Sequence, residues 1–372
     1  MKNLYRSSSN CASLLPMAIT TVITGCRALL GSELRIVDGA TVVLEGDRIL
    51  AAGSAAELSE PSDSEVVDAG GLTLIPGFID AHVHIGFAAP GEVLRHGVTT
   101  VRDLGWPPKK IWPLVEASIA SDFDGPEVLA AGQMITVSRG YPTRAGWAPR
   151  HTGLPVRSPA EAREAVAAQA DAGACVIKVA LNPLVGPVLD LETLTAVVRA
   201  AHDRSLRVTG HTYALEELHK ALDAGMDELA HMLMSPETIP PATIEHMVRR
   251  SMAVVPTLSC FFGSDQEIAV ENLRSFARSG GRVIYGTDLG NEGPRPGIDP
   301  REVDAMSRAG MSPLEIVASA TVRSARYLGL DDRGVLEAGR RADVVAVSGD
   351  PLADVLSLTD VALVWRGGRL VK

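Results

Sequence analysis

Two histidines, His82 and His84, stand one residue apart at the end of the apolar run 76–84. If this run is a β-strand, side-chain alternation places both imidazoles on one face, where both can reach a single metal ion. Imidazole nitrogen is a common protein ligand of zinc. A pair of histidines on one face of a strand can equally be an ordinary polar edge, so this motif needs support from the rest of the chain.

Four further residues with reactive or metal-binding side chains follow other apolar segments: Lys178, His211, His231 and Asp288. An ammonium group in the apolar segment 175–180 is costly unless it is paired or neutral. A structural ion pair is one interpretation of Lys178. The other is a desolvated amine that reacts with carbon dioxide to give a carbamate, whose two oxygens can bridge two metal ions. His211 and His231 could each be core residues, and Asp288 could cap a turn.

The chain between residues 74 and 289 alternates short apolar segments with helical ones, which is typical of a parallel sheet with crossover helices. Eight strands are predicted at 74–84, 99–104, 127–134, 176–181, 207–213, 228–232, 253–258 and 283–289. The clearest helices are predicted at 159–172, 191–203, 214–224 and 241–250. The fold class is therefore α/β, a (β/α)8 TIM barrel. In such a barrel the carboxyl ends of the strands meet at one rim, which brings all six candidate residues together.

Both ends of the chain have a different pattern, with short strand-like segments separated by glycine and aspartate turns. The two sets can pair into one small β-sandwich, with the barrel inserted between them. The predicted division is an N-terminal extension at 1–20, the N-terminal half of the sandwich at 21–75, a metal-dependent barrel at 76–332 and the C-terminal half of the sandwich at 333–372.

Composition narrows the possible partners of the chain. It has 372 residues, of which 46% are hydrophobic, and a formal net charge of -10. This charge argues against nucleic acid and anionic membrane surfaces as partners. The simpler interpretation is that the acidity only keeps the protein in solution. No segment outside the N-terminal region is long and apolar enough to suggest a membrane span.

The cysteines and the N-terminus bear on the location of the protein. Four cysteines without a CxxC motif are typical of reduced thiols in a cytoplasmic protein. Lys2 and Arg6 precede an apolar stretch at 14–22, and the segment 23–26 resembles a lipoprotein processing site. However, Pro16 interrupts the apolar stretch and Cys26 falls within the first predicted strand, so we expect a cytoplasmic protein.

Several of these motifs together resemble one known family. The residues and segments concerned are 76–84, Lys178, His211, His231, 286–288 and the closing segment 338–345. In combination they resemble the amidohydrolase superfamily, and within it the binuclear branch with a carboxylated lysine, near its prolidase-like and dipeptidase-like members. The resemblance extends from about residue 22 to the end of the chain.

The resemblance implies a pair of divalent metal ions, with zinc as the default. One ion would be held by His82, His84 and Asp288, the other by His211 and His231. A carbamate formed from carbon dioxide on Lys178 would bridge the two ions.

The resemblance also implies how the site reacts. A bridging hydroxide would attack the substrate carbonyl, and Asp288 would carry its proton to the leaving group. Tyr213 shares a strand face with His211 and would help to polarise the carbonyl oxygen.

The function expected from this resemblance is hydrolysis of an amide C–N bond in a small molecule such as an N-acyl amino acid or a dipeptide. A lactone, ester or carbamate hydrolase is the alternative, and a ring deaminase or a non-catalytic assembly protein would fit the sequence less well. Relatives commonly form homo-oligomers.

Relatives often contact the substrate with a histidine after the third strand. In this chain the matching segment, 138–142, contains no histidine. The candidate substrate contacts are Tyr141, Arg144, His151 and Arg295.

Overall fold

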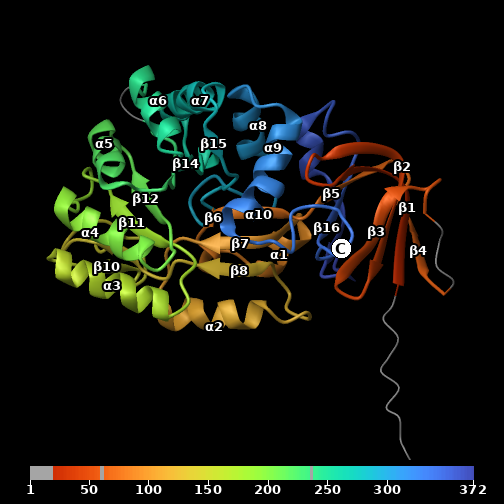
Figure 1. Ribbon diagram of the computed structural model, residues 1–372, viewed down its shortest axis with the longest axis horizontal. Helices are drawn as coiled ribbons and strands as arrows, with labels where there is room; N and C mark the ends of the chain where they lie inside the picture. The colour runs from red at the N-terminus through yellow and green to blue at the C-terminus, as the bar shows by residue number, and fades with distance from the viewer. Residues whose placement is uncertain (1–19, 59–62, 235–237) are drawn as a thin grey trace, which may run out of the picture.

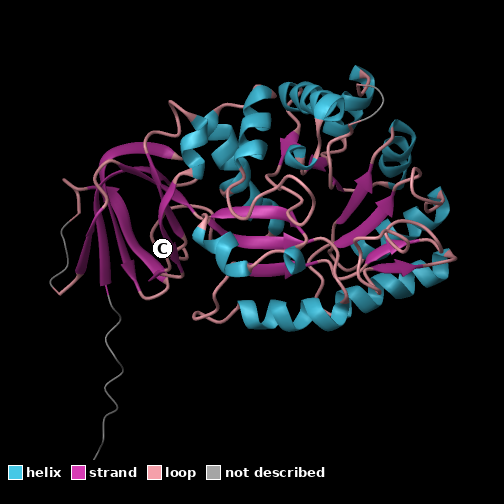
Figure 2. Cartoon of the chain, turned by 180° about the vertical axis from the view of Figure 1, so that it is seen from behind, coloured by secondary structure: helices cyan, strands magenta, loops and turns pink. Residues whose placement is uncertain are grey.

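The computed structural model describes residues 20–58, 63–234 and 238–372. It consists of a β-rich region, built from the two ends of the chain, beside a larger α/β region (Figures 1 and 2). The basic residues Lys2 and Arg6 and most of the apolar stretch 14–22 lie outside the described residues. Cys26 lies within the first strand, where it is buried, as the sequence predicts.

The β-rich region is one hydrogen-bonded sheet in the order β18-β17-β16-β5-β1-β2-β3, with β4 paired to β1. Its strands are β1 (Thr20–Leu30), β2 (Arg35–Glu45), β3 (Arg48–Ser54), β4 (Glu65–Asp68), β5 (Leu72–Pro76), β16 (Val344–Ser348), β17 (Val361–Arg366) and β18 (Arg369–Leu370). The antiparallel pairing of β16 with β5 joins the two ends of the chain. The beginning of β1 pairs with β4 and its end with β5, and Gly25 between them has a φ of 74°.

The α/β region contains two sheets with parallel pairing throughout. One has the order β6-β7-β8 and the other β10-β9-β11-β12-β13-β14-β15. The strands are β6 (Phe78–Val83), β7 (Val98–Asp103), β8 (Glu127–Ala130), β9 (Met134–Thr136), β10 (Gly153–Pro155), β11 (Ile177–Leu181), β12 (Val208–Thr212), β13 (Glu228–Leu229), β14 (Ala253–Val254) and β15 (Arg282–Val283). The predicted parallel α/β organisation is therefore present.

The third predicted strand, at 127–134, is wrong as a single element. The structure divides it into β8, which belongs to the first sheet, and β9, which belongs to the second. Gly132 lies between them with a φ of 78°. This left-handed conformation is incompatible with an extended strand, so the chain turns from one sheet into the other at this glycine.

Backbone hydrogen bonds also connect the two parallel sheets at their edges. On one side, the Ala81 N–H donates to the Tyr285 carbonyl at 3.0 Å and the His84 N–H donates to the Leu289 carbonyl at 2.7 Å. On the other side, the Cys175 N–H donates to the Ala130 carbonyl at 2.9 Å. These bonds hold the segments that follow β15 beside β6, and so bring distant parts of the chain to the same end of the strands.

Along the chain the helices alternate with the parallel strands, and in space they cover them (Figure 2). They are α1 (Pro90–Arg95), α2 (Pro108–Ser118), α3 (Pro159–Asp171), α4 (Leu191–His202), α5 (Leu215–Ala224), α6 (Pro241–Arg249), α7 (Gly263–Arg278), α8 (Pro300–Arg308), α9 (Pro313–Ala320) and α10 (Val322–Leu328). Local chemistry fixes where α3 and α4 begin, because the side chains of Ser158 and Asp190 accept hydrogen bonds from the N–H groups of their first turns. In the described part of the chain, no helix combines the length and apolar character that a membrane crossing requires.

Candidate metal centre

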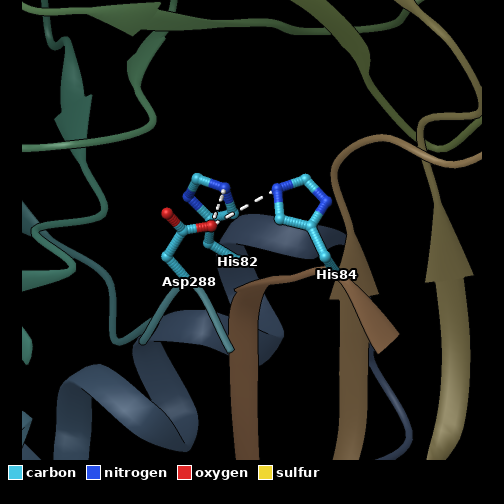
Figure 3. A group of neighbouring side chains, drawn as sticks. All are labelled: His82, His84 and Asp288. Carbon is cyan, nitrogen blue, oxygen red and sulfur yellow. Dashed lines mark ion pairs between the residues drawn. The ribbon is translucent and has the colours of Figure 1, made fainter. Parts of the chain in front are cut away.

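Three predicted residues meet at the ends of strands from both halves of the α/β region. His82 is in β6, His84 follows that strand directly, and Asp288 lies in the loop after β15 with a φ of 60°. Figure 3 shows both imidazole rings turned toward the same carboxylate. The Nε2 atoms of His82 and His84 lie 3.1 Å and 3.3 Å from Asp288 Oδ1. All three side chains are buried.

Hydrogen bonds on the other ring nitrogens fix the tautomers of these two histidines. His82 Nδ1 lies 2.7 Å from the Ala230 carbonyl oxygen, and His84 Nδ1 lies 3.2 Å from that of Gly105. A carbonyl oxygen only accepts, so each Nδ1 carries the proton and each neutral ring presents a lone pair at Nε2. Asp288 Oδ1 is also an acceptor and has no hydrogen-bond partner among the described residues. Three acceptor atoms therefore face one another without a donor between them.

His211 and His231 form a second pair beside the first. His211 is in β12, and His231 follows β13. His231 Nε2 lies 2.8 Å from His211 Nδ1, and His231 Nδ1 lies 2.8 Å from the hydroxyl of Thr257. Asn182 Nδ2 lies 3.3 Å from the remaining nitrogen, His211 Nε2. Two more imidazole nitrogens thus converge within the reach of one ion.

Lys178 lies in β11 and is completely buried. Its Nζ has no hydrogen-bond partner within the part of the chain that the structure describes. Burial lowers the pKa of Lys178 to about 7, although the charges of Asp288 and Glu228 act in the opposite direction. A substantial fraction of this side chain is therefore a neutral, nucleophilic amine near neutral pH.

Burial favours the neutral form of three of the four histidines. It lowers the pKa of His82 to about 4 and holds the pKa values of His211 and His231 well below their ordinary value. Burial also acts to lower the pKa of His84, but the neighbouring carboxylate of Asp288 outweighs it and leaves that pKa raised.

Burial would raise the pKa of Asp288, but the neighbouring histidines, led by His82, hold it well below the ordinary value. Its carboxylate therefore stays ionised. The ionised carboxylate and the neutral rings of His82, His211 and His231 are the protonation states that metal ligands require, because a ligand must offer a lone pair.

The donor set fits divalent metal ions. His82, His84 and Asp288 form one compact group of ligand atoms, and His231, Cys260 and Asp288 form another; in each group the atoms lie within 4.8 Å of one another. An uncompensated set of buried acceptors costs free energy, and a cation placed among them removes that cost. Imidazole and carboxylate together suit zinc and similar ions.

The predicted tyrosines lie beside the second histidine pair. The ring of Tyr141 stacks on His211 at a centroid distance of 4.5 Å, and Tyr213 meets His211 edge-on at 4.4 Å. In contrast, Arg144, His151 and Arg295 are exposed. Their role in binding substrate stays a prediction.

The sequence-based prediction of the site does not include four residues that the structure places there: Asn182, Thr257, Cys260 and Trp147. The ring centroid of Trp147 lies 5.2 Å from that of His84. Asn182 had a usable signal, because it stands four residues after Lys178 and so continues the same face of that strand. Trp147 comes from a loop with no periodic pattern, and only the fold brings it to the site.

A cleft of about 330 Å³ opens beside Asp288. Its walls are mainly aromatic, sulfur-containing and acidic, and come from the loops after β12, β13, β14 and β15 and from the start of α7. The lining residues are Tyr213, Met234, Cys260, Phe261, Phe262, Asp265, Asp288, Asn291 and Glu292. The cleft gives a small molecule access to the buried carboxylate.

Comparisons with known proteins agree with this geometry. The model of the amidohydrolase family matches residues 73–371. An enamidase of Eubacterium barkeri is 25% identical over 360 residues, which cover 90% of this chain and 88% of the enamidase. An ochratoxinase of Aspergillus niger is 26% identical over 377 aligned residues, which cover 80% of this chain and 75% of that protein.

Among solved structures, a Xaa-Pro dipeptidase with methionine bound in its active site superimposes with a TM-score of 0.80 at 24% sequence identity. The superposition covers 94% of this chain and 99% of the dipeptidase. At this identity the similarity establishes a shared fold.

Proposed function

The chain belongs to the amidohydrolase family, and we propose that it hydrolyses an amide C–N bond in a small molecule with the help of two divalent metal ions. The observation that carries this proposal is the convergence of His82 Nε2, His84 Nε2 and Asp288 Oδ1, three buried acceptor atoms with no donor between them. A catalytic cation is the partner that such a set lacks.

His82, His84 and Asp288 would hold one ion, and His211 and His231 the other. Zinc suits these ligands best. When bound, such ions lower the pKa of water and polarise a carbonyl group.

Lys178 would join the two ion sites. Its buried and unpartnered Nζ supports this role, since a neutral amine reacts with carbon dioxide to give a carbamate and a proton. The carbamate would supply two anionic oxygens and convert a costly buried amine into a ligand.

Asp288 would serve as the proton carrier. Its ionised carboxylate accepts a proton from the attacking water and then donates it to the amide nitrogen as the C–N bond breaks. The products are a carboxylate and an amine. The burial of this group and its position beside the 330 Å³ cleft support this assignment.

Tyr213 would help to stabilise the negative charge that develops on the substrate oxygen. Burial holds the pKa of its hydroxyl well above the ordinary value, so the hydroxyl keeps its proton and can donate a hydrogen bond. Its position on the wall of the cleft and its contact with His211 support this role.

The site and the relatives together support a proposal for the substrate class. The names enamidase, ochratoxinase and Xaa-Pro dipeptidase favour a small amide, and we propose an N-acyl amino acid or a dipeptide.

We also propose that the parallel strands close into an eight-stranded barrel. The hydrogen bonds from His84 to Leu289 and from Cys175 to Ala130 support this closure.

The test is a mass-spectrometric screen of the protein loaded with zinc and bicarbonate against pooled N-acyl amino acids, dipeptides, lactones and amino-heterocycles. Cleavage of an acyl amino acid or dipeptide into two fragments is the expected result. A lactone that only gains water would indicate the alternative hydrolase. A heterocycle that exchanges its amino group for oxygen would indicate a deaminase, and either outcome alone would contradict the proposed substrate class.

A further inference from the structure

A broad cleft lies at the opposite end of the parallel strands from the candidate metal centre. Its volume is about 760 Å³, within the usual range of small-molecule sites. Its walls come from the turn at 32–34, the starts of β12 and β15, the end of α7, and helices α9 and α10. Arg207 in this cleft precedes His211 by four residues along one strand, a separation of roughly 13 Å.

Four arginines line this cleft, and all four are exposed: Arg207, Arg282, Arg323 and Arg326. Two of them flank one aromatic ring. The guanidinium carbons of Arg207 and Arg282 lie 4.4 Å and 5.8 Å from the ring centroid of Tyr327. Arg207 also donates a hydrogen bond to the Tyr327 carbonyl at 2.5 Å. Cation–π contact and this bond hold two positive charges in fixed positions around a buried ring.

No direct ion pair among the described residues neutralises these positive charges. Among the described residues, no carboxylate comes within the 4.0 Å of an ion pair for any of the four guanidinium groups. Two carboxylates line the cleft, those of Glu33 and Glu315. Glu315 accepts hydrogen bonds from the N–H and the hydroxyl of Ser312 in a capping box, and its charge also interacts with that of Arg323. Two carboxylates stand against four guanidinium groups. The cleft is therefore positive in a chain whose formal net charge is -10.

We propose that this cleft is a binding site for a small polyanion that carries phosphate or carboxylate groups. Guanidinium groups recognise both kinds of oxyanion through paired N–H donors. Arg323 and Arg326 stand three positions apart on α10 and so share a face of that helix. Together with the pair around Tyr327 they make two separate points of positive charge, which suits a ligand with at least two anionic groups.

Isothermal titration calorimetry of the full-length, zinc-loaded protein at constant ionic strength tests this proposal. Pyrophosphate is the phosphate probe, tricarballylate the carboxylate probe, and acetate the monovalent reference. We expect saturable binding of at least one polyanion. The double variant R323Q/R326Q should bind it at least about tenfold more weakly, because two charge-assisted contacts are lost. The matched control is R163Q on α3, an exposed arginine outside the cleft, which should bind like the unaltered protein.

Both probes could also reach the metal centre, and the variant Lys178→Ala separates the two sites. Binding that persists in Lys178→Ala and weakens in R323Q/R326Q supports the cleft. Binding that disappears in Lys178→Ala and stays unchanged in R323Q/R326Q would place the anion at the metal centre and overturn the proposal, as would the absence of saturable binding. Matching circular dichroism melting curves verify that the double variant is folded.

Discussion

Two sets of buried charged groups occupy the interior of the parallel strands, and they differ in how their charges are neutralised. In one set, Arg102 Nη2 donates to Glu228 Oε1 at 2.6 Å and Arg102 Nε donates to the Ala81 carbonyl at 2.8 Å. In the other set, Lys178 Nζ and Asp288 Oδ1 have no hydrogen-bond partner among the described residues. The first set contains a direct ion pair within the chain, although Glu228 Oε2 has no hydrogen-bond partner among the described residues. In the second set, Lys178 has no such ion pair, and we propose that a group from outside the chain completes it.

This contrast indicates which buried polar residues to assign to structure and which to function. Arg102 and Lys178 are both long cations within completely buried strands, so burial alone does not distinguish them. Only Arg102 has a carboxylate of the chain as a direct ion-pair partner. Four substitutions test whether the ion-paired set serves stability and the other set serves catalysis.

The largest effect is expected from Lys178→Ala. We expect metal content to fall and kcat/KM to drop by at least about 100-fold, because the variant removes the group that we propose as the bridge between two ions. Metal analysis by mass spectrometry and a turnover assay measure both changes. A short-chain carboxylic acid should restore part of the activity by replacing the carbamate. Full metal retention in Lys178→Ala would refute the bridging role.

Asp288→Asn should lower kcat by roughly 10²- to 10⁴-fold while the protein keeps its metal, because the amide can still offer an oxygen but cannot carry a proton. Steady-state kinetics with parallel metal analysis tests this. If the variant turns over substrate at the original rate, Asp288 is not the proton carrier.

Arg102→Met is expected to act on stability. Removing one partner leaves Glu228 as an unpaired buried charge, which should cost about 3–5 kcal/mol of unfolding free energy. Urea unfolding measures the loss. The matched variant R102M/E228L removes both charges and should recover most of the stability. If Arg102→Met unfolds at the same urea concentration as the unaltered protein, the pair is not a structural one.

Tyr213→Phe should produce the smallest change, a fall in kcat of about 100-fold with little change in KM, since one hydrogen bond to the developing oxyanion is lost. Metal content and melting temperature should stay unchanged, which distinguishes a catalytic role from a structural one. An equal loss in Tm and activity would instead make Tyr213 a packing residue around His211.

The sequence predicts a helix or strand correctly when the residues that determine it are near neighbours in the chain. Helix α3 is predicted at 159–172 and observed at Pro159–Asp171, because its periodicity and its Ser158 cap both lie in the local sequence. The strand predicted at 127–134 fails for the opposite reason. The φ of Gly132 is set by the two sheets that it connects, and an apolar run does not report a change of sheet.

For the candidate site, side-chain alternation and strand–helix order predict that six residues share one rim. The grouping of His82, His84 and Asp288 within that rim came from the resemblance to a family. Only the folded chain shows which atoms face one another, which pKa values shift and which polar atoms have no partner. Trp147 and the arginines around Tyr327 show the same limit. This limit exists because burial and ion pairing depend on contacts between residues far apart in the chain, whereas strand and helix patterns depend on near neighbours.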